Sequence, residues 1–223
     1  ARFTSMRAGD QRARRSREVR RISNAVGSLW RARLGMKITG AVLCGGASTR
    51  MRQDKASLML TGRPMAEWVA DAMREAGVEP VIALGGQEGL SLPVVPDEIE
   101  DQGPLYILIS ALERLGDILV CPCDVPLASA KLFRSIVDAG AGTDKPVVLA
   151  KCTQLQPLIG LYKASSIDLL KAGYEGGKRG PKLVLEEHDV EVVDASAEET
   201  QNINTPAQFK ALVDDLTIRN HES

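Results

Sequence analysis

The stretch VLCGGASTRMRQDKASL, residues 42–58, opens the first folded element that the sequence predicts. An apolar run ends in Gly45 and Gly46, and Arg50 and Lys55 follow within ten residues. Adjacent glycines leave backbone N–H groups uncovered by side chains, so an anion can approach them and the following cations can neutralise it. The stretch predicts a phosphate-binding loop. Its spacing matches neither Walker A nor the dinucleotide fingerprint, which favours a third type of nucleotide loop.

Length and composition indicate one ordinary globular domain with a full core, because the 223 residues are 44% hydrophobic and 26% charged. The formal net charge of -1 argues against bulk binding to nucleic acid or membranes. No apolar run is long enough to span a bilayer. The four cysteines form no C-x-x-C pair, which argues against a zinc site and favours reduced thiols in a cytoplasmic protein.

Residues 1–35 differ from the rest of the chain: they are rich in arginine, nearly free of acids and lack the apolar period of a core helix. We expect them to lie outside the fold and residues 36–223 to form a single domain. Met36 directly precedes the first predicted strand, which favours an upstream extension translated from an early start. A transit peptide and a basic nucleic-acid arm are the alternatives.

From residue 37 onward, short apolar runs alternate with amphipathic stretches. Strands are predicted to end at Leu43 and to include residues 81–84, 118–120 and 147–149. Helices are predicted from Pro64 to a glycine at 77, from Pro104 through a leucine at 115, and through residues 132–137. This alternation predicts an α/β fold with right-handed crossovers and a mainly parallel sheet covered on both faces. Ligands bind at the carboxyl ends of the strands in such folds.

Polar residues follow several of these strand ends. Asp97 follows the apolar pair 94–95, Gly103 and Pro104 come next, and Asp124 follows the strand at 118–120. The structural alternatives are a turn cap for Asp97, helix-start punctuation for Gly103 and Pro104, and a solvated face for the cations at 50 and 55. Asp124 lies directly after a buried strand and just before proline, so we favour Mg²⁺ coordination there.

Seven motifs in order now identify a resemblance: Leu43-Cys44-Gly45-Gly46, Arg50-Met51, Asp54-Lys55, Gly103-Pro104-Leu105, Cys123-Asp124-Val125-Pro126, Gln156-Pro157-Leu158 and Asn202-Ile203-Asn204-Thr205-Pro206. Together the motifs resemble the molybdenum cofactor guanylyltransferases, the MobA family. The resemblance implies a three-layer α/β/α Rossmann-like sandwich of the nucleotide-diphospho-sugar transferase type. It implies transfer of GMP from GTP to the phosphate of molybdopterin, with release of pyrophosphate. It further implies Mg²⁺ as cofactor, and molybdoenzymes or their chaperones as partners.

The resemblance also assigns roles to individual residues. Those implied to bind the nucleotide are Leu43, Cys44, Gly45, Gly46, Lys55, Asp97 and Asp124, and Asp124 is also the implied metal ligand. Those implied to bind the acceptor are Gln156, Asn202 and Asn204. For the two asparagines a structural interpretation is equally good, because residues 205–208 form a capping box and asparagine favours the turn before it.

The chemistry explains why these residue types would serve. An already anionic phosphate attacks the α-phosphorus, so no nucleophilic side chain or general base is required. Two polyanions must instead be brought together, and Arg50 and Lys55, with Mg²⁺ on Asp124, would offset their repulsion. We therefore predict these three residues to be catalytic. The basic residues at 178, 179 and 182, in a glycine-rich segment, are left out because lone cations there are more often solvated.

The chain departs from the family pattern at three places. Arg52 stands where the family has glycine, Tyr106 and Ile107 replace a small residue and glycine, and Gly85-Gly86 replaces an asparagine found in some relatives. A cytidylyltransferase, or another phosphate nucleotidyltransferase, would keep the same loop and charged residues. A non-enzymatic nucleotide-binding homologue is the third alternative, favoured if Arg52 and Tyr106 damage the site.

Overall fold

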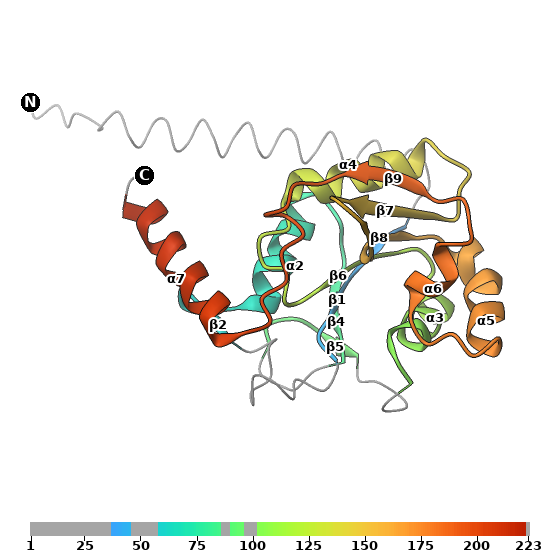
Figure 1. The fold of residues 1–223 in the computed structure, drawn as a ribbon, viewed down its shortest axis with the longest axis horizontal. Helices are drawn as coiled ribbons and strands as arrows, with labels where there is room; N and C mark the ends of the chain where they lie inside the picture. The colour runs from blue at the N-terminus through green and yellow to red at the C-terminus, as the bar shows by residue number, and fades with distance from the viewer. Residues whose placement is uncertain (1–36, 46–57, 86–89, 96–101, 222–223) are drawn as a thin grey trace, which may run out of the picture. The chain divides into compact units, whose positions relative to one another are not determined.

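A seven-stranded sheet lies at the centre of the fold. The computed structural model describes residues 37–45, 58–85, 90–95 and 102–221 (Figure 1). The strands are β1 (Thr39–Leu43), β2 (Met59–Leu60), β3 (Arg63–Pro64), β4 (Val81–Leu84), β5 (Val94–Val95), β6 (Ile118–Pro122), β7 (Val147–Lys151), β8 (Leu155–Tyr162) and β9 (Glu191–Asp194). The helices are α2 (Met65–Glu75), α3 (Pro104–Leu115), α4 (Ala130–Ala141), the 3₁₀ turn η2 (Ala164–Ser166), α5 (Ile167–Glu175), α6 (Pro181–Leu185) and α7 (Pro206–His221).

Seven strands form the sheet in the order β5-β4-β1-β6-β8-β7-β9, and β2 and β3 form a separate small hairpin. β1 pairs in parallel with both β4 and β6, β4 with β5, and β7 with β9. The predicted mainly parallel sheet is confirmed. β8 was not predicted, and it runs antiparallel to both β6 and β7.

The reversal at β8 has a local cause. β7 and β8 form a hairpin, because Lys151 faces Leu155 across a three-residue loop. The pairing is irregular, and its register shifts between Leu149 and Ala150. Gly160 is needed there, since a Cβ at this position would lie 2.3 Å from the backbone oxygen of Val148.

Helices cover both faces of the sheet, as predicted (Figure 1). α2 packs against β1, β4 and β6, and α4 packs against β7, β8 and β9. α3, α5 and α6 form the opposite layer, where α3 contacts β6 and α6 contacts β8. The core on that side joins the helices to alternate strand residues such as Ala41 of β1 and Tyr162 of β8. The three-layer α/β/α architecture is confirmed.

Local sequence signals explain where the predicted helices begin and end. α2 starts directly after Pro64, and Gly77 beyond its end adopts φ = 81°. α3 begins at Pro104, and the Ser129 side chain caps α4 by accepting from the Leu132 N–H at 3.0 Å. No helix in the described ranges has the length and apolarity to cross a membrane. Residues 1–36 lie outside the described residues, so the boundary expected after residue 35 stays a prediction.

Candidate functional site

The carboxyl ends of four parallel strands meet at one edge of the sheet. Leu43 at the end of β1 pairs with Leu84 at the end of β4 and with Pro122 at the end of β6. Leu84 pairs in turn with Val95 at the end of β5. The segments after these strands therefore begin side by side, which is where a parallel α/β sheet binds its ligand. We call this edge the strand-end site.

The loop after β1 enters the strand-end site with its first amides already bonded. The N–H groups of Cys44 and Gly45 both donate to the Leu84 carbonyl, at 2.8 and 3.2 Å. Cys44 is buried and Gly45 is exposed. The Gly45 N–H therefore already has an acceptor within the protein. Gly46, Arg50 and Lys55 lie outside the described residues.

Asp124 lies two residues beyond β6, in the same strand-end site. The Cys123 N–H donates to the Leu43 carbonyl at 3.0 Å, so this loop continues the pairing of β6 with β1. Cys123 is buried and Asp124 is half-buried. The Val125 N–H returns to the Pro122 carbonyl at 3.2 Å, which turns the chain around Asp124. The structure therefore places the Asp124 carboxylate where the sequence predicts it. Asp97, the other predicted carboxylate, lies outside the described residues.

The segment before α7, which is distant from Asp124 in the sequence, forms hydrogen bonds with it. Asn202 Nδ2 donates to Asp124 Oδ1 at 3.0 Å, and the Ile203 N–H donates to the Asp124 main-chain oxygen at 2.8 Å. Asn202 is half-buried and Ile203 is buried. The structure thus brings Asn202 and Asp124 together, although 78 positions separate them in the chain.

Asn204 begins the helix cap that the sequence predicts. The N–H groups of Asn204 and Thr205 both donate to Gln208 Oε1, at 2.9 and 3.0 Å. The Gln208 N–H donates to Thr205 Oγ1 at 3.2 Å, which completes the capping box of α7. The structural interpretation of this turn is confirmed, while the predicted acceptor contact of Asn204 stays a prediction.

Gln156 lies on β8, opposite Ala150 of β7. Because β8 runs antiparallel to β6, its first residues point to the edge at which β6 ends. Gln156 is half-buried, and its Nε2 donates to the Gln154 carbonyl at 3.4 Å. This position is consistent with a role at the strand-end site.

Burial determines the protonation state of the Cys121 thiol, which interacts electrostatically with Asp124. Burial, followed by the negative charge of Asp124, raises the pKa of Cys121 well above its usual range. The Cys121 thiol therefore stays protonated, and it is not a thiolate nucleophile. This agrees with a reaction in which the substrate's own phosphate attacks. All four cysteines of the chain carry free thiols.

A contact that sequence analysis missed lies at the start of α3. Gly103 has φ = 81°, and the Leu105 N–H donates to the Arg179 carbonyl at 3.2 Å. The Arg179 guanidinium stacks on the Tyr174 ring at 4.3 Å and donates to the Tyr174 carbonyl at 2.9 Å. The Tyr106 ring lies 5.7 Å from the same ring. Tyr106, one of the departures from the family pattern, therefore packs between α3 and α5.

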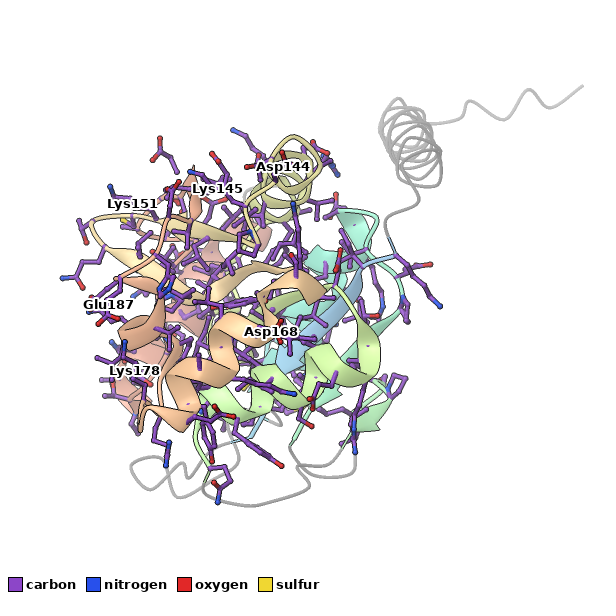
Figure 2. The ribbon with its side chains drawn as sticks, turned by 90° about the vertical axis from the view of Figure 1, so that its right-hand side faces the viewer. Asp144, Lys145, Lys151, Asp168, Lys178 and Glu187 are labelled. Atoms are coloured by element: carbon purple, nitrogen blue, oxygen red, sulfur yellow. The ribbon has the colours of Figure 1, made fainter. Side chains whose placement is uncertain are left out.

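Two of the basic residues left out of the predicted site are ion-paired. Lys178 Nζ lies 2.6 Å from Glu187 Oε2, and Lys182 Nζ lies 3.6 Å from Glu186 Oε1. Lys178 and Glu187 lie on the same flank of the molecule (Figure 2). The hydrogen bond from Lys178 lowers the pKa of Glu187. These lysines therefore form ion pairs at the surface of the α5–α6 region. This supports leaving them out of the predicted catalytic residues.

Together, this fold and this edge are those of an α/β protein of the class that binds its ligands at the carboxyl ends of parallel strands. The sequence profile of the MobA-like NTP transferase domain matches residues 40–192. The chain belongs to this family, and the predicted family resemblance is confirmed.

Comparison with individual proteins agrees with this assignment. A protein named molybdenum cofactor guanylyltransferase from Xanthomonas euvesicatoria pv. vesicatoria is 32% identical over 183 residues, which cover 78% of this chain and 94% of that protein. The crystal structure of molybdopterin-guanine dinucleotide biosynthesis protein A from Archaeoglobus fulgidus has a TM-score of 0.66 at 21% identity, covering 80% and 98% of the two chains. A Mycobacterium tuberculosis protein crystallised in complex with manganese has a TM-score of 0.56 at 18% identity, covering 80% and 99%. The two structures share the fold.

Proposed function

We propose that this chain transfers GMP from GTP to the phosphate of molybdopterin and forms the molybdopterin guanine dinucleotide cofactor. The observation that carries the proposal is the position of Asp124, two residues beyond β6 in the strand-end site, where its carboxylate accepts from Asn202. The substrates are supported by the relative from Xanthomonas, whose name states this activity and which aligns over 94% of its length. In this reaction an acceptor phosphate oxygen bonds to the α-phosphorus of GTP, and the bond to the bridging oxygen of pyrophosphate breaks.

The described residues fit a divalent cation at Asp124. A carboxylate and an amide side chain lie within one hydrogen bond of each other, and oxygen donors of this kind suit hard cations. Mg²⁺ commonly takes one or two carboxylates and completes its shell with substrate phosphates and water. We propose Asp124 as the protein ligand of Mg²⁺. When bound with GTP, the cation would neutralise triphosphate charge and stabilise the departing pyrophosphate.

The remaining roles belong to residues of this chain alone. Arg50 and Lys55 would contact the triphosphate and offset the repulsion between the two anionic substrates. The backbone of residues 43–46 and the Asp97 side chain would bind the guanine nucleotide. Gln156 and Asn204 would contact the acceptor through amides that both donate and accept. A positioned cation can contribute about 2.7–4 kcal/mol to the transition state, by analogy with a single oxyanion-hole donor.

The direct test is product formation with purified chain, molybdopterin and each of GTP, CTP, ATP and UTP in the presence of Mg²⁺. We expect the guanine dinucleotide and pyrophosphate in equal amounts from GTP, and neither when EDTA replaces Mg²⁺. A higher turnover with CTP would make the chain a cytidylyltransferase. Nucleotide binding without turnover on any acceptor phosphate would make it a non-enzymatic homologue. Cytoplasmic location and delivery of the product to molybdoenzymes or their chaperones complete the proposal.

A further inference from the structure

Asp124 is held twice by consecutive residues of the segment that precedes α7. Asn202 Nδ2 donates to the Asp124 carboxylate at 3.0 Å, and the Ile203 N–H donates to the Asp124 carbonyl at 2.8 Å. One bond fixes the main chain of the loop after β6, and the other fixes the orientation of its side chain. The terminal torsion of an aspartate is broad when nothing restrains it, so the second bond removes a real freedom.

The main chain that carries the donor is anchored by the residues that follow it. Ile203 is 1% exposed and packs in a cluster with Leu60, Met65 and Leu212. Two residues beyond Ile203, the Thr205–Gln208 capping box fixes the first turn of α7. Asn202 therefore cannot drift away from Asp124 without disturbing a buried side chain or a helix cap. Its amide is set in place before any ligand binds.

A hydrogen bond of this kind has a known consequence at metal sites. Groups that hydrogen-bond to a ligating carboxylate fix its orientation, and removing such a group typically weakens metal affinity about 10–100-fold. The resemblance instead implies that Asn202 contacts the acceptor. The two roles predict different losses when Asn202 is replaced. If Asn202 positions Asp124, the affinity for the cation falls, whereas if it contacts the acceptor, the affinity for the acceptor falls.

We propose that Asn202 is a positioning residue that orients the Asp124 carboxylate for the divalent cation. The inference rests on the proposed function, because it requires a cation at Asp124. Asn202 would then act on the nucleotide side of the reaction through Asp124. The segment before α7 would thereby belong to the metal site, although it lies at the far end of the chain from the first nucleotide loop.

The test measures cation binding directly, by electron paramagnetic resonance of Mn²⁺ with the full chain and a non-hydrolysable α,β-methylene analogue of GTP. Asn202→Ala should weaken Mn²⁺ affinity about tenfold or more. Affinity for the GTP analogue in EDTA and the KM for molybdopterin should stay unchanged. Asn202→Leu, which keeps the number and branching of side-chain heavy atoms without a donor, should give the same result and covers the case in which the alanine variant does not fold.

Asn204→Ala is the contrasting variant, because Asn204 lies in the same turn and the Asn202 side chain, which donates to Asp124 Oδ1, is left in place. It should leave Mn²⁺ affinity at the parent value, and any loss should appear in the KM for molybdopterin. If both Asn202 variants bind Mn²⁺ as the parent does while the KM for molybdopterin rises, Asn202 is an acceptor contact and the inference is overturned. An equal loss of analogue affinity in EDTA would also overturn it, since that indicates general damage.

The failure of the proposed function gives a different result. If the parent chain shows no nucleotide-dependent Mn²⁺ binding, or if Asp124→Ala binds Mn²⁺ as well as the parent, the cation is not held at Asp124. The proposed metal site then fails, and the inference fails with it. Loss in Asp124→Ala together with unchanged binding in both Asn202 variants rejects the inference alone.

Discussion

Asp124 is the residue at which function and folding should separate most clearly. The main-chain bond that Asp124 accepts from Ile203 does not involve its side chain, and its half-buried carboxylate accepts from Asn202. Asp124→Ala should therefore lower the free energy of unfolding by about 1.5–3 kcal/mol, the range for a hydrogen bond to a charged group. We expect guanylyl transfer to fall by ~10²–10³-fold, by analogy with loss of one transition-state charge contact. Turnover and thermal unfolding of the same preparation check both expectations.

Asp124→Asn is the matched control for this prediction. It keeps the volume and an oxygen that can accept from Asn202, but it removes the charge. If charge on a metal ligand is what matters, the asparagine variant should melt like the parent and still lose most of its turnover. Mg²⁺-dependent turnover retained in Asp124→Ala would remove Asp124 from the metal site.

Lys55 tests whether the first loop acts in the transition state. The positive charge of the Lys55 side chain should matter most as pyrophosphate departs. Lys55→Ala should therefore lower the rate constant by more than it lowers GTP affinity. Lys55→Arg should rescue poorly, since a planar guanidinium does not replace a compact ammonium between two phosphates. Single-turnover kinetics at saturating molybdopterin, with GTP varied, measure both quantities. A change in GTP affinity alone would make Lys55 a ground-state tether and pass the catalytic role to Arg50 or the cation.

At the scale of elements, the sequence predicted the parts of the sheet that local signals encode. β1, β4, β6 and β7 each contain an apolar run, and α2, α3 and α4 carry an apolar stripe with proline or serine at the start. β8 escaped because Pro157 and Gly160 interrupt it and its register shifts part-way along. Its direction depends on pairing Tyr162 with Ile118, a contact between distant parts of the chain.

In the strand-end site, too, the sequence predicted only what local signals encode. Residues directly after parallel strands, such as Asp124 and Cys44, could be placed from the strand pattern and the rule for ligand sites. The bond from Asn202 to Asp124 could not, because it depends on how the segment before α7 folds back over the loop after β6. The Arg179 carbonyl at the start of α3 was missed for the same reason, since main-chain contacts leave no residue signature.

Gly103 provides the test at this scale, because it joins α3 to the segment before α6. Its φ of 81° and ψ of 166° lie in a region that only glycine adopts readily. An added Cβ would also lie 2.9 Å from the Arg179 carbonyl oxygen, whose partner is the Leu105 N–H. Gly103→Ala should therefore destabilise the fold by about 1–3 kcal/mol, measured by denaturant unfolding.

Gly142→Ala is the matched control, since it follows α4 with φ = -93°. The nearest atoms to an added Cβ there lie 3.7 Å away, an ordinary contact. This variant should be neutral or more stable by about 0.4–1 kcal/mol, through reduced entropy of the unfolded chain. Equal losses in both variants would show that glycine content, and not the docking of Arg179, limits stability.

At the scale of the whole molecule, charge is divided unevenly along the chain. Ten of the 28 Lys and Arg residues and two of the 29 Asp and Glu residues lie in residues 1–35. The rest of the chain therefore carries a formal net charge of -9, against -1 for the full chain. A more negative domain repels polyanionic substrates at long range, but screening at physiological salt confines this effect to about 8 Å. Local cations in the strand-end site should then matter more than net charge.

Removal of residues 1–35 tests the proposed domain boundary. The family profile begins at residue 40 and the described sheet begins with β1, so the variant that starts at Met36 retains both. We expect an unchanged melting temperature and unchanged guanylyl transfer at physiological salt, with a slower reaction only at low ionic strength, where repulsion is unscreened. A loss of several degrees in melting temperature would mean that the boundary is misplaced. Binding of DNA or RNA by the full chain but not by the shortened chain would identify residues 1–35 as a nucleic-acid arm. Such binding should weaken steeply as the salt concentration rises, because it depends on counterion release.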